Sequence, residues 1–517
     1  MSYLKKFLPL LLVFTMLMTL LAACSESSNT PEETTDSGSE SVTTQDQGAT
    51  SEDESTEDPS VLDGVTFPGK VLNVLLDSRG NTSEYTEELT EKMDVLDKAI
   101  YDRCDAAENR LQLRTKWEVM TGHTQDQYVE KAELENMNGG LWDVFDSRSE
   151  GAPVLMTRGV FSNLLSQKYF DFEHPGWAQS MIEDLAVENK LYFATGDVST
   201  NLVFMTNVVF FNKALVKDLN VNEKIKTLTD GECEDLYTLT TEGKWTLDKL
   251  IALSETAYKD LNNDGKKNSG DRYGFTTYHN MFPNFYWGGG YMCVKVLGDG
   301  FEISEDYLNP TLVGDILTTV NNFLHDSKDG FIEENYSKAK ANFAEGKALF
   351  TMGPASHALN TYSVKANLEY SVLPVPKHNE SQTRYCATQS TNYLVISIAS
   401  HSKNTEAAGA FIQALTEASN EISRPAIIDK LMKGRYAEDP EDAKMWDYAI
   451  DANVFDIGRV YGYMFTEEGD DLPLPESLLR EKIRAKNDNW VNVVTGRGQQ
   501  LAIMANTLAG QIAGLPD

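Results

Sequence analysis

Basic side chains and cysteines are scarce in this sequence. Its 45 Lys and Arg residues stand against 79 Asp and Glu residues, which gives a formal net charge of −34. This acidity argues against nucleic acid as a partner and against docking of the folded body on anionic lipid, since both would repel it. The five cysteines include no CxxC pair, so we expect no metal bound by cysteine.

Motifs of catalysis are also missing. The sequence contains no GxSxG elbow, no P-loop, no GxGxxG and no HExxH, and carboxylate pairs are uninformative in so acidic a chain. Single histidines occur in polar stretches, none near a second at ligand spacing: His123, His174, His279, His357, His378 and His401. We therefore expect no enzyme. A secreted glycoside hydrolase is the main alternative, because it too combines aromatic residues with carboxylates.

The N-terminus carries an apolar run that is too short for a stable membrane span. Lys5 and Lys6 precede the run Phe7–Leu20, and small residues lead to Cys24. The segment 21–24 (LAAC) resembles the lipobox of bacterial lipoproteins, in which the cysteine is acylated and becomes the mature N-terminus. We expect residues 1–23 to be a signal peptide and Cys24 to be the lipid anchor. An ordinary signal peptide with an incidental Cys24 is the alternative.

The segment that follows is acidic and polar. Residues 25–63 contain no lysine, no arginine and no aromatic residue, so this stretch cannot bury enough apolar surface to offset its chain entropy. We expect residues 24–65 to form a lipidated cysteine and a disordered tether. An acidic interaction tail is the alternative. No second apolar run of spanning length follows.

Strands alternate with helices in the first part of the body. Apolar spacing predicts strands at 70–76, 114–119 and 142–145 and helices within 84–113 and 124–137. This order is typical of a parallel α/β sheet covered on both faces. Ligands bind beyond the carboxyl ends of such strands, so the loops 77–80 and 146–149 are candidate site loops.

Six segments in order resemble one family. They are 190–197 (KLYFATGD), 209–213 (VFFNK), 243–248 (GKWTLD), 343–350 (FAEGKALF), 373–377 (LPVPK) and 404–415 (NTEAAGAFIQAL). Their order and spacing are similar to the extracellular solute-binding proteins of bacterial ABC importers, of the maltodextrin-binding type.

The resemblance implies an α/β, two-lobed periplasmic-binding-protein-like fold (type II), with a hinge between the lobes and the ligand in the cleft between them. Lobe 1 is expected at 66–193, with 388–440 returning to it, and lobe 2 at 194–387, with 441–517 completing the lobes. The crossings would fall near 194–206 and 387–393. Small residues there, such as Gly196 and Ser199, suit a hinge.

A sugar ligand needs flat aromatic faces and planar polar groups. Aromatic residues cluster beside the glycines 288–290, and of these we expect Tyr286 and Trp287 to face the cleft, although such a cluster is also typical of packed core. The polar candidates in the expected inter-lobe loops are Arg79, Asp146, Arg148, Asp197 and Asn392. The family's sugar binders often carry tryptophan after Gly-Pro, where this chain continues as Ala355-Ser356-His357; this argues against a long maltodextrin.

The segment 260–271 (DLNNDGKKNSGD) fits the calcium loop of the EF-hand. The expected ligands at positions 1, 3, 5, 7, 9 and 12 are Asp260, Asn262, Asp264, the backbone carbonyl of Lys266, Asn268 and Asp271. An aspartate at position 12 resembles dockerin-type loops. We expect one structural Ca²⁺; a hydrophilic surface turn is the alternative.

The resemblance implies a carbohydrate ligand, for which we expect an oligosaccharide, and ABC permease subunits as partners. The protein would act as a monomer on the extracellular face of the membrane, held by its lipid anchor only. A receptor that delivers ligand to a sensor kinase stays open. Pairing of the four remaining cysteines also stays open: Cys104, Cys233, Cys293 and Cys386.

Overall fold

The computed structural model describes residues 60–78, 83–90, 93–122, 124–298, 300–365, 367–466 and 474–516. The chain divides into two units, Met1–Asp58 and Pro59–Asp517, and every element described below belongs to the second. The predictions for the signal segment, Cys24 and Arg79 lie outside the described residues. Leu62 is buried in the core, so packed structure begins before the expected start at residue 66.

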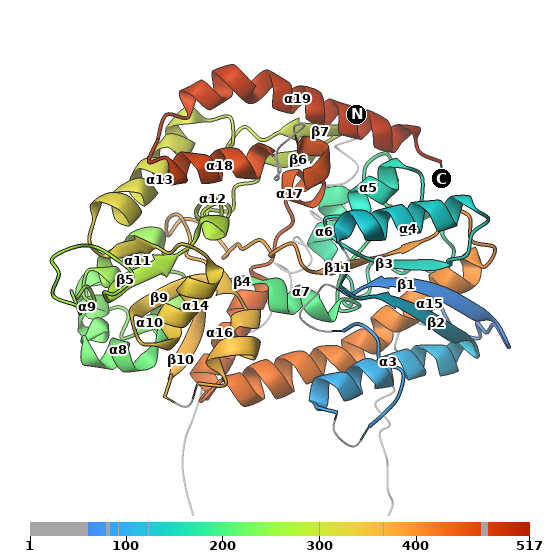
Figure 1. Cartoon of the computed structure of the whole chain (residues 1–517), viewed down its shortest axis with the longest axis horizontal. Helices are drawn as coiled ribbons and strands as arrows, with labels where there is room; N and C mark the ends of the chain where they lie inside the picture. Colours follow the sequence, from blue (N-terminus) through green and yellow to red (C-terminus); the bar gives the residue numbers. More distant parts are fainter. Residues whose placement is uncertain are drawn as a thin grey trace, which may run out of the picture. The chain divides into compact units, whose positions relative to one another are not determined.

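The second unit is an α/β structure (Figure 1). Its strands are β1 (Val71–Asp77), β2 (Arg114–Met120), β3 (Val144–Arg148), β4 (Asn207–Asn212), β5 (Tyr273–Thr277), β6 (Val294–Leu297), β7 (Gly300–Ile303), β8 (Gly330–Ile332), β9 (Ala348–Pro354), β10 (Tyr370–Pro374) and β11 (Leu394–Ile398). Its α-helices are α3 (Val95–Leu111), α4 (Gln125–Met137), α5 (Ala152–Thr157), α6 (Gln179–Leu185), α7 (Thr200–Met205), α8 (Lys213–Asp218), α9 (Val221–Leu228), α10 (Leu236–Thr241), α11 (Leu247–Ser254), α12 (Asn284–Trp287), α13 (Pro310–Asn321), α14 (Tyr336–Ala344), α15 (Thr405–Ala418), α16 (Pro440–Asp451), α17 (Ile457–Val460), α18 (Leu474–Arg484) and α19 (Val491–Gly514). Shorter helices of other types are η1 (Leu164–Ser166), η2 (His279–Met281), η3 (Asn322–Asp326), η4 (Ala358–Tyr362), η5 (Ser419–Ser423), η6 (Ala426–Tyr436) and η7 (Gly462–Phe465).

The first sheet has the strand order β11-β3-β1-β2. The strands β1, β2 and β3 are parallel, as the alternation of strands and helices predicts, and β11 joins β3 antiparallel. The expected helix within 84–113 is shorter than predicted. It begins only after Asp94, whose side chain accepts from the backbone N–H groups of Leu96 and Asp97 and caps α3.

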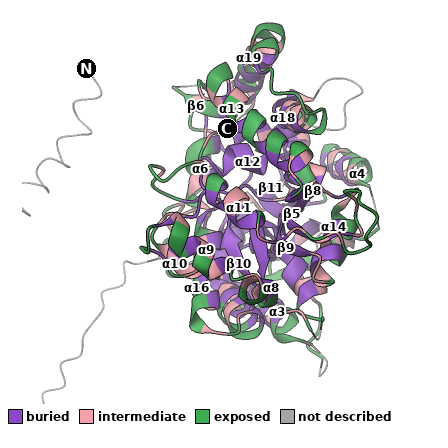
Figure 2. Cartoon of the chain, turned by 90° about the vertical axis from the view of Figure 1, so that its left-hand side faces the viewer, coloured by how far each residue is buried: buried purple, intermediate pink, exposed green. Residues whose placement is uncertain are grey.

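The second sheet has the order β10-β4-β9-β5-β8 and mixes parallel with antiparallel pairs. All residues of β4, β5, β9 and β10 are buried, which is typical of strands covered on both faces. Figure 2 shows this buried interior, with exposed residues on the surrounding helices. The class of fold predicted from the sequence, a two-lobed α/β fold, is confirmed, and the two larger of its three sheets are separate.

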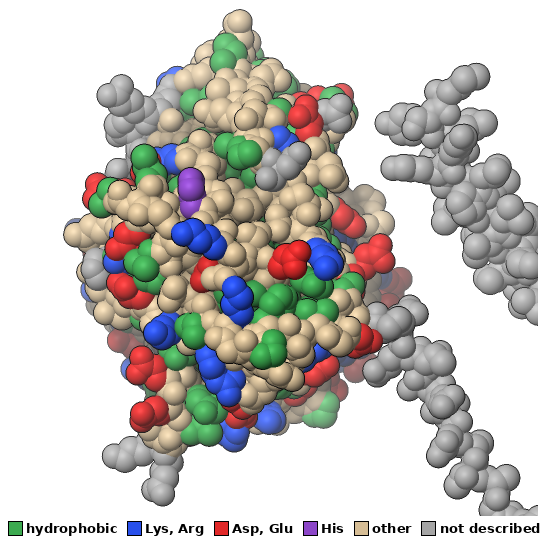
Figure 3. Space-filling view, turned by 90° about the vertical axis from the view of Figure 1, so that its right-hand side faces the viewer, with side chains coloured by type: hydrophobic (Ala, Val, Ile, Leu, Met, Phe, Trp, Pro, Cys, Tyr) green, Lys and Arg blue, Asp and Glu red, His purple; other side chains and the backbone are tan. Residues whose placement is uncertain are grey.

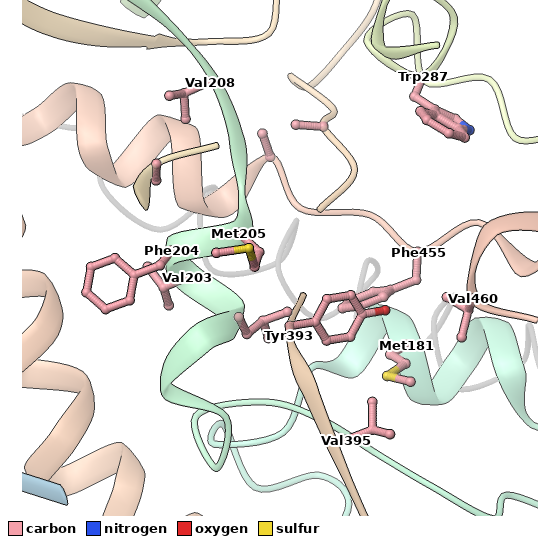
Figure 4. Packing of buried hydrophobic residues seen from close by; sticks show 14 of the residues in the cluster. Met181, Val203, Phe204, Met205, Val208, Trp287, Tyr393, Val395, Phe455 and Val460 are labelled. Carbon is pink, nitrogen blue, oxygen red and sulfur yellow. The ribbon is translucent and has the colours of Figure 1, made fainter. Parts of the chain in front are cut away.

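Two neighbouring segments connect the sheets, 194–206 leading into β4 and 387–393 leading into β11. They pair with each other: Ser390 N–H donates to Met205 O at 2.8 Å, and Asn207 N–H donates to Thr388 O at 3.3 Å. Met205 and Tyr393 belong to one apolar cluster there (Figure 4). The residues at which one lobe ends and the other begins stay a prediction.

Gly196 lies in the first of these segments, and close packing explains why a glycine is present. A Cβ atom at this position would come within 2.2 Å of the carbonyl oxygen of Gly176. The backbone here has no room for a side chain, and this holds whether or not the segment also acts as a hinge.

The C-terminal region adds α16 against β10 and the long helix α19 against β7. In Figure 1, α18 and α19 lie beside the small antiparallel sheet of β6 and β7. Across the described residues, no helix has both the length and the apolar character needed to cross a bilayer.

Candidate functional site

A polar cavity of about 730 Å³ opens where segments from both sheets meet. Glu150 follows β3 of the first sheet, whereas Tyr278 follows β5 and Ser356 follows β9 of the second. Asn392 comes from the segment that connects the two sheets. The cavity therefore lies beyond the carboxyl ends of these strands, where α/β sheets place their ligands. Its volume falls within the roughly 300–1,000 Å³ of small-molecule sites.

Two exposed tyrosines line this cavity. Tyr336 is the first residue of α14 and is 54% exposed, and Tyr463 of η7 is 43% exposed. The ammonium group of Lys340, one helical turn after Tyr336, lies 5.2 Å from the centre of the Tyr336 ring. Exposed rings of this kind offer flat apolar faces to a ligand at small conformational cost.

Hydroxyl and amide groups supply most of the polar lining. Asn280, Ser356, Ser390, Thr391 and Asn392 all border the cavity. The Ser390 hydroxyl donates to Asn207 Oδ1 at 3.1 Å, and the Thr391 hydroxyl donates to the carboxylate of Glu150. These bonds fix the direction of the groups from the connecting segment.

The charged lining residues Arg459, Glu476 and Glu150 are held by ion pairs. Arg459 forms an ion pair with Glu476, donates through Nε to Gln389 O at 3.0 Å, and lies 5.0 Å from the centre of the Trp287 ring. Glu150 faces Arg148 Nη2 at 3.6 Å. Such pairing orients the charges and leaves hydrogen-bonding capacity on Arg459 and Glu150 that can face a ligand.

His357 lies in the wall of the cavity and is 5% exposed. Burial lowers its pKa to about 3, with a further contribution from nearby Lys340, so the ring is neutral. Its Nδ1 atom is buried and has no hydrogen-bond partner in the protein. We expected His357 in a polar loop, but it is buried at the edge of the hydrophobic core. Its Nδ1 atom lies against the backbone at Gly353, so a ligand would need to displace the ring to reach it.

Gly353 makes room for this ring. A Cβ atom at position 353 would lie 2.5 Å from both Nδ1 and Cε1 of His357. The glycine of the segment Gly353–His357 is therefore needed for the ring position, and any larger residue would push the imidazole out of place.

The polar residues expected at the site fall in different places. Asn392 lines the cavity, and Arg148 lies beside it through Glu150. Asp146 is buried, and burial together with the nearby Glu84 carboxylate raises its pKa well above the usual range. Asp197 instead accepts from Arg424 at 2.9 Å and from Asn420 at 2.7 Å. Neither aspartate lines the cavity.

Tyr286 and Trp287 do not face the cavity. They are 1% and 0% exposed, with Tyr286 donating to Met292 O at 3.2 Å and Trp287 Nε1 to Asp456 Oδ2 at 3.0 Å. The alternative interpretation, packed core, describes both rings. Asp456 lies in the C-terminal region, far from the aromatic cluster in sequence, so local sequence gave no indication of this partner.

The sequence analysis missed Tyr336 and Tyr463, as well as Arg459. A signal was present for Tyr336, because Asn335 accepts from Lys338 N–H and caps α14, so the next residue stands in the exposed first turn. An aromatic residue there has little core to pack on. No comparable signal marks Tyr463.

The four cysteines are buried free thiols: Cys104, Cys233, Cys293 and Cys386. Burial raises the pKa of each, to about 11 for Cys104. No two of these four cysteines form a disulfide in this structure, which answers the question of their pairing.

The expected calcium loop lies outside the cavity lining. Asn262, Asp264 and Lys266 are exposed, Asp260 and Asn268 are half-buried, and Asp271 is buried. Within the part of the chain that the structure describes, no three histidine, cysteine, aspartate or glutamate side chains gather as a metal site by themselves. A metal in this loop would need its amide and carbonyl oxygens as well.

Comparison with known proteins finds one matching family model. Residues 167–422 match the model of the bacterial extracellular solute-binding proteins, which is more than half of the unit Pro59–Asp517. This part of the chain is similar to that family. No curated protein matches it significantly in sequence.

Solved structures with a similar fold share little sequence with this chain. UspC from Mycobacterium tuberculosis is 13% identical, with a TM-score of 0.50, and the match covers 85% of this chain and 100% of UspC. Apo RafE from Streptococcus pneumoniae is 15% identical, with a TM-score of 0.49 and coverage of 86% and 98%. The galacto-N-biose-/lacto-N-biose I-binding protein from Bifidobacterium longum, solved with lacto-N-biose, is 14% identical, with a TM-score of 0.48 and coverage of 86% and 97%. At these identities the UspC likeness concerns the fold alone.

Proposed function

We propose that this protein is the substrate-binding component of an ABC importer and that it captures a carbohydrate in the cavity between its two sheets. The observation that carries the proposal is the lining itself: two exposed tyrosines stand beside amide and hydroxyl groups. Aromatic faces suit the C–H surfaces of a sugar ring, and amides and hydroxyls suit its hydroxyl groups. The volume of about 730 Å³ favours an oligosaccharide over a single sugar ring.

The connections between the sheets support a closing motion. Among the described residues, the paired segments 194–206 and 387–393 link the two larger sheets directly, in extended or short helical backbone, and the C-terminal region packs against elements beside both. A ligand that contacts Glu150 on one side and Tyr336 on the other would favour the closed arrangement by its contacts to both. Delivery to permease subunits follows as the proposed role, with the protein acting as a monomer.

A ligand screen tests the proposal. The unit Pro59–Asp517 is screened by thermal shift against mono- and oligosaccharides, because a ligand that binds only the folded state raises the Tm. Small-angle scattering then measures the radius of gyration with each hit, which should fall on closure. A tightly bound sugar that leaves the radius unchanged would contradict the hinge mechanism.

Two variants place the ligand in the cavity. Tyr336→Ala should weaken binding about 10-fold, whereas Tyr336→Phe, which keeps the ring face, should bind within about 3-fold of the unchanged protein. Since Tyr336 is exposed, neither variant should lower the Tm appreciably. Equal affinity of all three proteins would place the sugar elsewhere.

We propose binding without catalysis. Of the cavity carboxylates, Glu476 is paired with Arg459 and Glu150 accepts a hydrogen bond from Thr391, so both are already engaged by groups of the protein. Chromatography of an oligosaccharide after prolonged incubation should show no cleavage. Release of shorter sugars would favour the glycoside hydrolase instead.

We further propose that Cys24 carries a lipid and holds the protein on the extracellular face of the membrane. The proposal is supported by the lipobox-like segment 21–24 and by the family, whose members act outside the cytoplasm. The face shown in Figure 3 carries both basic and acidic side chains, so it offers no plain electrostatic route to anionic lipid. Cys24→Ser should abolish labelling by a fatty acid analogue; retained label would refute the anchor.

A further inference from the structure

The loop that precedes β5 has the backbone of a cation site. Asp260 accepts through its two carboxylate oxygens from Asn263 N–H at 2.6 Å and from Gly265 N–H at 2.9 Å. Asp264 accepts from Lys266 N–H at 2.8 Å. Gly265, at the sixth position, has φ +71°, which a residue with a side chain rarely adopts. These bonds wind the loop around its own acidic side chains.

Polar groups of the loop gather around the side-chain amide of Asn268. The amide nitrogen of Asn268 donates both to Asp264 Oδ2 at 2.9 Å and to the Lys266 carbonyl at 3.1 Å. Asn262 in turn donates to Asn268 Oδ1 at 3.3 Å. The side-chain nitrogen of Asn268 thus lies between the groups of positions 5 and 7, and position 3 contacts position 9. A cation would take the place of this nitrogen. The amides of Asn262 and Asn268 would then turn their oxygens toward the ion and release the N–H groups of Asp264 and Gly270.

A second, independent observation concerns Asp271, at position 12. Its side chain is 1% exposed, and its Oδ1 atom is buried without any hydrogen-bond partner. Its Oδ2 atom accepts from Asn268 N–H and from the Tyr273 hydroxyl, each at 3.3 Å, so the carboxylate is held against the loop. A buried carboxylate oxygen without a donor is unfavourable. A cation in the loop would satisfy it.

We propose that this loop binds one Ca²⁺ ion through Asp260, Asn262, Asp264, the Lys266 carbonyl, Asn268 and Asp271. All six ligands are hard oxygen atoms, as Ca²⁺ prefers, and none is the nitrogen or sulfur that zinc or copper would favour. Three carboxylates give the site a charge of about −3 before binding, which the cation offsets. Mg²⁺ fits less well, because it demands near-ideal octahedral geometry and gives up water reluctantly.

The ion would fix the base of the lobe that carries Tyr336. Lys267 donates to the carbonyls of Leu324 and Ser327 at 2.9 and 2.8 Å, and Asn342 of α14 donates to the carbonyl of Ser269 at 3.4 Å. The loop thereby joins η3, α14 and the start of β5. We assign the ion a structural role, because the loop has no second helix pair that could open as a sensor.

Calorimetric titration of the full-length, metal-depleted protein with Ca²⁺ alone tests the site. One ion per chain should bind, and the Tm should rise by about 2–5 °C at a hundredfold excess of Ca²⁺ over its Kd. The same concentration of Mg²⁺ should raise the Tm by less than half as much. No binding heat together with an unchanged Tm would overturn the proposal.

In a chain of net charge −34, Ca²⁺ could also raise the Tm by screening negative charge without binding at a specific site. Matched variants distinguish the two effects. Asp260→Asn and Asp264→Ala should each lose the Ca²⁺-dependent rise in Tm. Asp218→Asn removes the same charge as Asp260→Asn from an exposed position at the end of α8, and should keep the full rise. Equal loss in Asp218→Asn, or an unchanged rise in both loop variants, would show that Ca²⁺ acts elsewhere. Neither result depends on the sugar ligand, so the proposed function is tested separately.

Discussion

Replacing Trp287 by alanine should destabilise the fold rather than remove a ligand contact. The ring is 0% exposed, and about 200 Å² of buried indole corresponds to about 5 kcal/mol at 25 cal/mol per Å². Measured Trp→Ala changes in cores cost about 3–5 kcal/mol. The change also removes the Nε1–H donor to Asp456, which leaves a buried carboxylate less well solvated and costs about 1–3 kcal/mol more.

The expected shift in Tm follows from the size of the folded unit. At about 2.1 cal/mol/K per residue, the unfolding entropy of the roughly 460 residues from Pro59 is about 1 kcal/mol/K. Trp287→Ala should therefore lower the Tm by about 4–8 °C. Trp287→Phe keeps most of the apolar surface and loses only the donor, so its Tm should fall by about 1–3 °C.

Differential scanning calorimetry measures both shifts, and titration with the sugar at 20 °C measures affinity. The affinity of Trp287→Phe for the sugar should lie within about 3-fold of that of the unchanged protein. The Trp287 ring does not line the cavity, and phenylalanine keeps an aromatic ring next to Arg459. The reasoning fails if Trp287→Ala melts within 1 °C of the unchanged protein yet loses the ligand. That result would place the indole in the cleft.

Three further outcomes are expected. The pKa of His357 is about 3 in the folded state and about 6.5 in the unfolded state, so the unfolded state binds more protons below pH 6.5. Between pH 7.5 and 5.0, the protein should therefore lose about 2 kcal/mol of stability relative to His357→Gln, as measured by denaturant titration. Parallel pH profiles of the two proteins would contradict this. Gly353→Ala should displace the His357 ring and weaken sugar binding at least about 10-fold, whereas Gly510→Ala, a helical position with free space, should leave affinity unchanged in the same calorimetric assay. Arg103→Met should lower the free energy of unfolding by about 3–5 kcal/mol, because the buried Glu84 carboxylate loses the guanidinium that lies 2.7 Å away. Adding Glu84→Gln should recover part of this loss, as measured by urea unfolding. No recovery would show that the ion pair is not the cause.

The elements of the first sheet could be predicted because their signals are local. β1, β2 and β3 each carry enough apolar residues in a short run, and α4 starts at Thr124, which forms a capping box with Gln127. The start of α3 was misplaced for a reason that is not local. Glu84 pairs with Arg103 and accepts from the N–H groups of Thr200 and Asn201, so its region serves to cap α7 instead of extending α3.

Less of the candidate site could be predicted. The sequence placed Asn392 at the cavity and Arg148 beside it, because both lie next to strands of the first sheet. It pointed to Tyr286 and Trp287, because an aromatic cluster beside glycines suggests exposed rings, and it missed Tyr336. Exposure is decided by what packs on a ring, and for Trp287 that is Asp456 and Arg459, which arrive from the C-terminal region.

The same C-terminal region explains why a local motif cannot describe this site. It supplies Tyr463 and Glu476 to the cavity, and Arg459 joins its wall to the core through the Trp287 ring. His357 enters from the second sheet, where Gly353 leaves space for its ring. The contact of Gly353 with His357 is local, whereas that of Arg459 with Trp287 joins residues whose positions in the chain give no sign of their proximity. Because Arg459 is fixed by Glu476, Gln389 and Trp287 at once, the polar wall of the cavity is positioned by the folded core, before any ligand is bound.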